Sequence, residues 1–261
     1  MPLQPTDLAT LAQQLLDHGP VRTLPTTKRL RIQLGGAFVA DTTRGLYVWE
    51  HPHYPTYYVP LASLAPSSHT TLQTLHAGRA ALLRLAAGPR STDRVLAFAA
   101  DLPDKLKPLS GMVRVEFAAV DAWFEEDAPV FVHPKDPFKR VDIVLSTRPI
   151  RVSVAGKEVA VAASAQHLFE TGLPTRYYLP ATAVDPAVLR KSETRTRCPY
   201  KGEAEYYDVV VGEEVFKDVV WYYTTPTHES AAVAGLLCFY NEKVDIELDG
   251  EMLERPKTHF A

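Results

Sequence analysis

The feature that most constrains the fold is an internal repeat, in which residues 29–60 return 120 positions later. The matched segments are Arg31-Ile32 with Arg151-Val152, Gly36 with Gly156, Val39-Ala40 with Val159-Ala160, Trp49-Glu50 with Phe169-Glu170, and Tyr57-Tyr58-Val59-Pro60 with Tyr177-Tyr178-Leu179-Pro180. Order and spacing hold over about 34 positions without a gap, which is typical of a duplicated structural unit. The sequence therefore predicts two tandem copies of one domain, with a boundary near residue 147.

Two further matches extend the repeat, Trp123 with Trp221 and Val141-Asp142-Ile143 with Val244-Asp245-Ile246. We expect an N-terminal helix and linker over residues 1–27, a first, divergent copy over 28–146, and a second copy over 147–261. Pseudo-two-fold packing of the copies would make a monomer resemble an internal dimer, so that no further oligomerisation is required.

Most segments alternate apolar and polar residues with the period of a half-buried strand. One exception has apolar residues at helical spacing before Gly19-Pro20, which predicts a short N-terminal amphipathic helix: Leu8, Leu11, Ala12, Leu15 and Leu16. Residues 67–92 place leucines among alanines between Ser67-Ser68 and Gly88-Pro89, and this pattern predicts a helical insertion in the first copy. The predicted fold is mainly β with α+β flanks, built from two antiparallel domains.

The composition argues against several classes of protein. Lys and Arg total 28 against 31 Asp and Glu, and no basic run interleaves with aromatic residues as in a nucleic-acid groove. No apolar run approaches the roughly 20 residues of a membrane span, and no signal-peptide core is present. Two cysteines, Cys198 and Cys238, form neither a disulfide framework nor a four-thiolate zinc site. We expect a reduced, cytoplasmic protein without nucleic-acid or membrane partners, metal or cofactor.

The densest chemistry lies in Cys198-Pro199-Tyr200-Lys201-Gly202. Proline at the second position and glycine at the fifth predict a turn, which would bring the Cys198 thiol near the Lys201 ammonium. A neighbouring ammonium favours the thiolate and lowers a cysteine pKa. The alternative is a tight turn in which Cys198 packs as a small apolar group and Tyr200 fills a gap.

Aromatic residues follow at alternate positions of a predicted strand. Val219, Trp221 and Tyr223 share one face, so their flat rings would line a pocket or fill the hydrophobic core.

Five motifs of the second copy resemble the family catalogued as domain of unknown function 427. They are Glu170-Thr171-Gly172, Tyr177-Tyr178-Leu179-Pro180, Cys198 to Gly202, Trp221-x-Tyr223 and Val244-Asp245-Ile246. The first copy is similar to a divergent member, because it retains Trp49-Glu50, Tyr58-x-Pro60 and Trp123 but has no cysteine-lysine turn.

The resemblance implies a compact antiparallel domain similar to the β-tent of cereblon's thalidomide-binding domain and of the methionine sulfoxide reductase B group. Those relatives commonly hold zinc through paired Cys-x-x-Cys motifs, which this sequence does not contain, so we expect no structural zinc. Some catalogues label the family nucleotidyltransferase-like. Two acids on one strand face, here Asp245 and Glu247, can bind magnesium for that chemistry, but the required Gly-Ser loop and third acid are missing.

Three hypotheses about function remain open. The first is a small-molecule-binding module for a nucleoside or amino-acid derivative, with a second-copy pocket and a first-copy counterpart. Its second-copy residues are Glu170, Tyr178, Tyr200, Lys201, Trp221, Tyr223, Glu229 and Tyr240, and its first-copy residues are Trp49, Glu50, Tyr58 and Trp123. The second is an enzyme with Cys198 as nucleophile, Lys201 as activator, and Glu170, Glu229 or His228 as acid-base partner. The third is a structural protein with vestigial pockets.

Overall fold

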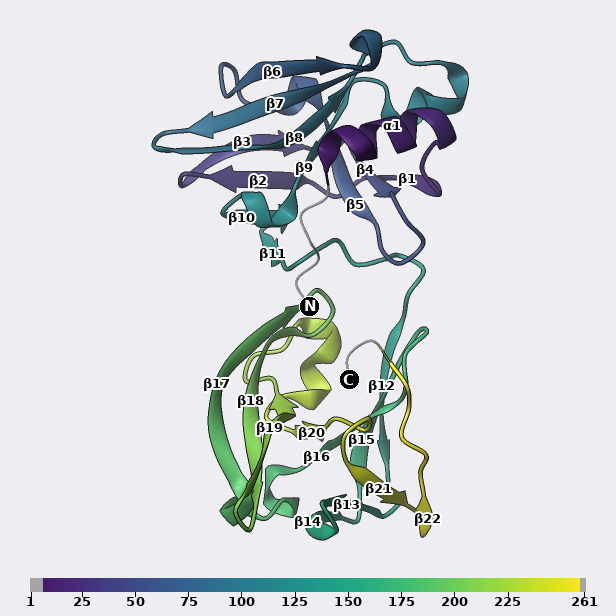
Figure 1. The fold of residues 1–261 in the computed structure, drawn as a ribbon, viewed down its shortest axis with the longest axis vertical. Helices are drawn as coiled ribbons and strands as arrows, with labels where there is room; N and C mark the ends of the chain where they lie inside the picture. Colours follow the sequence, from purple (N-terminus) through teal and green to yellow (C-terminus); the bar gives the residue numbers. More distant parts are fainter. Residues whose placement is uncertain (1–6, 259–261) are drawn as a thin grey trace. The chain divides into compact units, whose positions relative to one another are not determined.

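The computed structural model describes residues 7–258. The chain forms two compact units, Met1–Asp136 and Pro137–Ala261. Each unit contains one seven-stranded and one four-stranded sheet, and neighbouring strands pair in antiparallel fashion (Figure 1). The chain is thus mainly β, with two tandem units as the repeat predicts.

The first unit begins with the one long helix of the described chain. Its elements are α1 (Leu8–His18), β1 (Arg22–Thr26), β2 (Leu30–Leu34), β3 (Ala37–Thr42), β4 (Gly45–Trp49), β5 (Thr56–Pro60), η1 (Leu61–Ser63), β6 (His69–Leu75), η2 (His76–Gly78), β7 (Ala80–Ala87), β8 (Arg90–Phe98), η3 (Asp104–Leu109), β9 (Met112–Val115), η4 (Phe117–Ala119), β10 (Ala122–Glu125) and β11 (Ala128–Val130). The strand orders are β1-β4-β5-β9-β8-β7-β6 and β11-β10-β2-β3.

The second unit repeats this plan without a counterpart of α1 among its described elements. It contains β12 (Val141–Ser146), β13 (Ile150–Val154), β14 (Lys157–Ala162), β15 (Ala165–Glu170), β16 (Arg176–Leu179), η5 (Ala181–Ala183), η6 (Pro186–Val188), β17 (Leu189–Cys198), β18 (Gly202–Val211), β19 (Glu214–Tyr222), η7 (His228–Val233), β20 (Leu237–Phe239), β21 (Asp245–Leu248) and β22 (Glu251–Met252). The strand orders are β12-β15-β16-β20-β19-β18-β17 and β14-β13-β21-β22.

Equivalent strands and strand irregularities of the two units are 120 residues apart in the sequence. β2 to β5 correspond to β13 to β16, and the β2–β3 ladder has an irregularity after Ile32 where the β13–β14 ladder has one after Val152. The isolated bridge from Ala40 to Leu64 recurs between Ala160 and Val184. Such agreement in register confirms that the two units are copies of one fold.

The helical insertion predicted for residues 67–92 is wrong. This segment forms β6, β7 and the start of β8, and it corresponds to β17 and β18 of the second unit. Leu83 and Leu85 alternate into the core, and Gly78 has a φ of +87° in the turn between the strands. Cross-strand pairing therefore overrides the helical propensity of the alanines.

Two other sequence matches are also wrong. Trp123 lies opposite Ile32 and Ile246 lies opposite Val152, so the counterpart of Trp123 is Ile246 and not Trp221. β12, which contains Val141, pairs with β15 in the seven-stranded sheet, whereas Val244 to Ile246 lead into the four-stranded sheet. By position β12 corresponds to β1, a strand that occupies the expected linker before residue 28.

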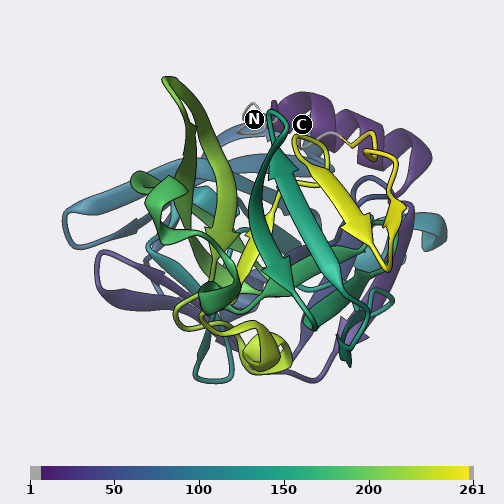
Figure 2. The same ribbon diagram turned by 90° about the horizontal axis from the view of Figure 1, so that it is seen from below.

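Each seven-stranded sheet is buried on two faces. We call the face against the four-stranded sheet the inner face and the opposite face the outer face. In the first unit, α1 lies against the seven-stranded sheet (Figure 1 and Figure 2). Its predicted apolar stripe packs on the outer face with Leu46, Val48, Tyr58 and Leu96. In the second unit the outer face carries aromatic residues, together with Val233 of η7.

Candidate functional site

The outer face of the second unit gathers most of the aromatic residues expected in a site. We define the outer aromatic cluster as Tyr178, Tyr206, Trp221, Tyr223 and Tyr240. Strand alternation explains this grouping, because Trp221 and Tyr223 project from β19 and its extension to the same side as Tyr178 on β16. The five side chains are brought together by strands that are distant in sequence.

The rings of this cluster pack on one another. The Trp221 indole Nε1–H donates to the Tyr178 hydroxyl at 3.0 Å, and the two rings form an edge contact with centroids 6.2 Å apart. Tyr240 lies 4.5 Å from Trp221 between ring centroids. Burial raises the pKa of Tyr178 and of Tyr223 well above the ordinary tyrosine value, so both hydroxyls stay neutral.

The predicted turn at Cys198 is present between β17 and β18. Cys198 pairs with Gly202, and residues 199–201 form the turn. Gly202 has a φ of +100°, a backbone conformation that favours glycine. The loop before η7 and η7 itself hold the turn. The Thr227 N–H donates to the Lys201 carbonyl at 3.1 Å, and the hydroxyl of Ser230 in η7 donates to the Tyr200 carbonyl at 3.1 Å.

Lys201 forms a nearly buried ion pair. Its Nζ donates to Glu170 Oε2 at 2.5 Å, and the side chains are 12% and 9% exposed. Burial opposes the ammonium charge, but the electrostatic interaction with Cys198 and the ion pair and hydrogen bond with Glu170 outweigh it and raise the pKa of Lys201. The turn therefore places a permanent cation beside Cys198.

The two cysteines differ in environment. Both are free; Cys198 is half-buried and Cys238 is fully buried. Burial raises the pKa of the Cys238 thiol far above its ordinary value. β18 and β19 separate the strands that carry the two cysteines. Because Cys198 is partly exposed and Cys238 is buried, a reagent from solvent would reach the Cys198 thiol first.

A second buried ion pair was not expected from the sequence. Arg176 donates from Nη1 and Nη2 to the two carboxylate oxygens of Glu242, at 2.7 Å each, and the side chains are 10% and 1% exposed. The Arg176 guanidinium carbon lies 5.5 Å from the Trp221 ring centre and 5.9 Å from that of Tyr240. Although burial opposes ionisation, hydrogen bonds from Arg176 and Thr258 lower the pKa of Glu242 to about 2.

No sequence signal identifies this pair, because Arg176 and Glu242 meet only through the pairing of β16 with β20. The position of Arg176 directly before the repeated Tyr177-Tyr178 motif is the one available hint.

Glu229 and His228 are exposed to solvent, unlike the two buried ion pairs. His228 Nε2 is 3.8 Å from Glu229 Oε1, and the His228 side chain is 87% exposed. Both residues begin η7 on the surface of the second unit. Glu229, which was expected to anchor a ligand, is therefore a solvated surface residue.

The four residues expected in a first-copy pocket divide between two faces of the sheet. Trp49 and Trp123 are buried in the inner core, and the Trp49 Nε1–H donates to Asp136 Oδ2 at 3.1 Å. Tyr58 belongs to the outer core under α1, and its hydroxyl donates to Glu50 Oε1 at 3.0 Å. These residues therefore do not form one pocket.

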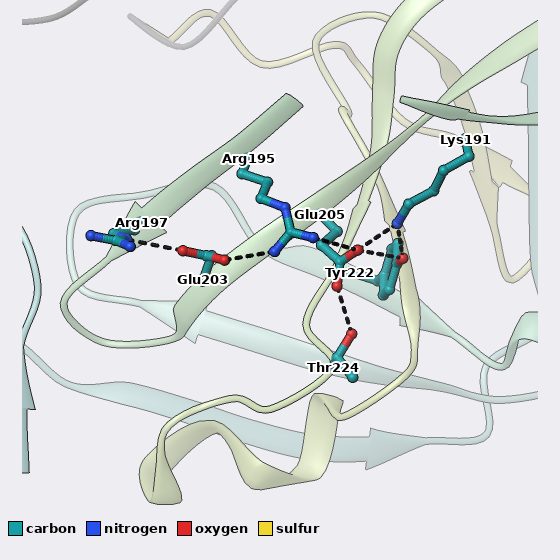
Figure 3. Close-up of polar contacts among 7 residues, drawn as sticks. All are labelled: Lys191, Arg195, Arg197, Glu203, Glu205, Tyr222 and Thr224. Carbon is teal, nitrogen blue, oxygen red and sulfur yellow. Dashed lines mark hydrogen bonds and ion pairs between the residues drawn. The ribbon is translucent and has the colours of Figure 1, made fainter. Parts of the chain in front are cut away.

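A polar network covers part of the β17–β18–β19 surface (Figure 3). Glu205 is at its centre and accepts hydrogen bonds from Lys191 Nζ at 2.6 Å, Thr224 Oγ1 at 2.9 Å and the Tyr222 hydroxyl at 3.2 Å. The hydrogen bond from Lys191 is the main reason why the pKa of Glu205 falls to about 2. This network braces the hairpin and holds its carboxylate ionised.

A surface recess of about 640 Å³ borders the second ion pair. Its lining residues are Gly172, Leu173, Pro174, Lys257 and Thr258. The Thr258 hydroxyl donates to Glu242 Oε1 at 2.6 Å, which connects the recess to Arg176.

Within residues 7–258, no three side chains of His, Cys, Asp or Glu are grouped to hold a metal ion. No helix in the same part of the chain is long and apolar enough to span a membrane.

The fold and the repeated register define a class of protein with two tandem domains, each built from two packed antiparallel sheets. The model of the family described as Domain of unknown function (DUF427) matches residues 22–126 and again residues 142–250. The chain therefore belongs to this family and contains two copies of its domain. A search of curated proteins gave no match.

Proposed function

We propose that the second unit binds a small polar molecule at the outer face of its seven-stranded sheet. The observation that supports this function is the presence of two nearly buried ion pairs, Lys201–Glu170 and Arg176–Glu242, around one aromatic cluster. Desolvation costs several kcal/mol per ion, so a buried ion pair gives little net stability. Perturbed charged groups that gather in one place are a common mark of a functional site.

The side chains favour a particular ligand class. Two cations and two carboxylates complement a molecule that carries both charges, and the ring of Tyr240, the one half-buried member of the aromatic cluster, complements a flat or apolar part. A nucleoside or an amino-acid derivative has this combination. The recess beside Thr258 is the entrance that we favour, because Thr258 contacts Glu242 directly.

A thiol-dependent reaction is the alternative function. The half-buried Cys198 interacts electrostatically with the ammonium of Lys201, and a thiol beside a cation is a candidate nucleophile. The exposed setting of His228 offers no positioned base. We rank binding first because it requires no base.

A thermal-shift screen with nucleosides, nucleotides, amino acids and common metabolites tests the proposal. We expect a ligand class that stabilises the wild type, by about 2.7 kcal/mol at one hundred times its Kd, and not Arg176→Met. The exposed Lys217→Met is the matched control and should respond as the wild type does. Because Arg176→Met is itself destabilised, the readout is the ligand-induced shift within each protein.

The remaining outcomes separate the hypotheses. A shift that persists in Arg176→Met and Lys201→Met would move the binding site elsewhere. No shift with any compound, together with ready alkylation of Cys198 that Lys201→Met slows, would favour thiol chemistry. No shift and no selective alkylation would favour a structural role.

A further inference from the structure

The same glutamate position has a buried cation in both units, but the cation comes from a different element. Glu50 and Glu170 occupy equivalent positions at the ends of β4 and β15. Glu170 pairs with Lys201 from a hairpin turn, whereas Glu50 pairs with Arg114 from β9. The first unit therefore has a charged centre of its own on the outer face.

Arg114 is incompletely satisfied at this centre. Its Nε donates to Glu50 Oε1 at 2.7 Å and its Nη2 to Glu50 Oε2 at 3.4 Å. Its Nη1 has no hydrogen-bond partner among the described residues and lies 3.8 Å from Glu116 Oε2. The side chain is 8% exposed. A buried donor left without an acceptor costs about 1–3 kcal/mol, and a bound acceptor would remove this penalty.

Two arginines and two glutamates meet at this centre. Arg94 donates to Glu116 Oε2 at 2.6 Å, so Arg94 and Arg114 face Glu116 and Glu50. A phosphate or carboxylate would meet two carboxylates at close range. A neutral oxygen atom would accept a hydrogen bond from Arg114 Nη1 without that repulsion.

An aromatic loop lies beside the ion pair. His51 and Tyr54, between β4 and β5, both interact electrostatically with Glu50 and Arg114. Tyr54 stacks on His133 with ring centroids 4.1 Å apart, and His51 contacts the edge of Tyr54 at 4.4 Å. These rings offer apolar area to a small planar molecule.

We propose that the first unit binds a small neutral carbonyl compound, such as an amide, whose oxygen accepts a hydrogen bond from Arg114 Nη1. This site is separate from the ligand site proposed in the second unit. Entry requires the side chains around Arg114 to move, because Nη1 is buried.

NMR of the arginine side-chain N–H groups in the full chain tests this site, with acetamide and N-methylacetamide as probes. We expect saturable, millimolar shifts of the Arg114 resonances with either amide, and binding at least tenfold weaker with acetate or inorganic phosphate. Because Arg114→Lys has no Arg114 resonances, the neighbouring Arg94 resonances report on that variant: they should shift saturably in the wild type and not in Arg114→Lys. Arg84→Lys removes an exposed arginine paired with Asp93 and should change nothing. Arg176→Met should also keep the response, which separates this site from the one in the second unit.

Glu50→Gln should change the ligand preference of the site, which a purely structural ion pair would not do. Removal of one carboxylate leaves a net positive centre, so the preference should reverse from acetamide to acetate. Circular dichroism establishes that Arg114→Lys and Glu50→Gln are folded. Absence of any saturable Arg114 shift, as with an ordered water only, would overturn the proposal. A saturable Arg94 shift that survives Arg114→Lys, or an unchanged preference in Glu50→Gln, would overturn it as well.

Discussion

At the scale of single residues, the chain concentrates its buried charges in a few side chains whose partners come from other strands. Lys201 and Arg176 each have a carboxylate partner inside the second unit, and Arg114 has one inside the first. Removal of one residue of such an ion pair leaves the charge of its partner buried and unpaired in a medium of low dielectric constant. These residues therefore connect the proposed binding sites to measurable stability.

Lys201→Met should lower the free energy of unfolding of the second unit by about 3–5 kcal/mol, because Glu170 would lose its buried partner. Urea denaturation followed by tryptophan fluorescence measures the change. Lys201→Met combined with Glu170→Gln should recover part of the loss, while the exposed Lys217→Met should stay within about 0.5 kcal/mol of the wild type. A loss below that control range for Lys201→Met would contradict the buried pair.

Glu242 predicts an acid-sensitive contribution to stability. Its pKa falls from an ordinary value of 4.5 to about 2 in the folded protein, so the unfolded chain takes up a proton first. The stabilisation is complete above about pH 4.5 and is lost as the pH falls towards about 2. Urea unfolding at pH 5, 4, 3 and 2.5 should therefore show a steeper decline for the wild type than for Glu242→Gln. Parallel curves would refute this assignment.

At the scale of elements, the two outer faces are closed by different parts. α1 closes the first unit with its apolar stripe. In the second unit the turn after β17 is held against η7 and the loop before it by Thr227 and Ser230, and large aromatic rings take up the remaining space. The family motif from Cys198 to Gly202 thus has a structural task in addition to its candidate chemistry.

Gly202→Ala should destabilise the second unit by about 1–3 kcal/mol, since an alanine at a φ of +100° is strained. Its Cβ would lie 3.4 Å from the Thr225 carbonyl oxygen, an ordinary van der Waals distance, so the loss comes from the backbone. Gly36→Ala is the matched control: its φ is also positive, at +76°, but its Cβ would meet nothing within 4 Å. We expect a smaller loss for the control by urea denaturation. Equal losses would mean that the φ of +100° at Gly202 is no more strained for an alanine than the φ of +76° at Gly36.

Leu15→Ala should lower the stability of the first unit by about 2–5 kcal/mol, because Leu15 is fully buried under the outer face. Gln14→Ala changes a solvated position of the same helix and serves as the control. Differential scanning calorimetry should show a lower transition temperature for Leu15→Ala. A shift no larger than that of Gln14→Ala would show that α1 is dispensable.

At the scale of the whole molecule, each unit has its own sheets and its own cores. The division between Asp136 and Pro137 keeps β12 with its partner β15. A boundary at residue 147 would separate these strands and expose Leu168 and Ile143 of the outer core.

A fragment over residues 137–261 should therefore fold alone, and a fragment over 147–261 should be less stable by several kcal/mol through the loss of one strand and its apolar contacts. Urea denaturation of the two fragments measures the difference. Equal stability would mean that β12 contributes little to the second unit.

The sequence by itself determined the duplication, the β class, α1 and the turn at Cys198. Each of these follows from local chemistry or from spacing along the chain: an apolar stripe before Gly19, a proline and a glycine at set positions, and a gapless repeat at 120 residues. Strand alternation also placed Trp221 and Tyr223 on one side, as in the structure, but Val219, expected on the same face, packs in the inner core. Tyr206 of the outer aromatic cluster was not expected.

Only the tertiary structure decided which distant segments pair. Residues 67–92, which were expected to be helical, form strands, because pairing with neighbouring strands satisfies their backbone groups and overrides local propensity. It divided Trp49 and Trp123 from Tyr58, and it brought Arg176 to Glu242 and Arg114 to Glu50. Such contacts depend on strand order and register, which a single sequence with short-range periodicity does not encode explicitly.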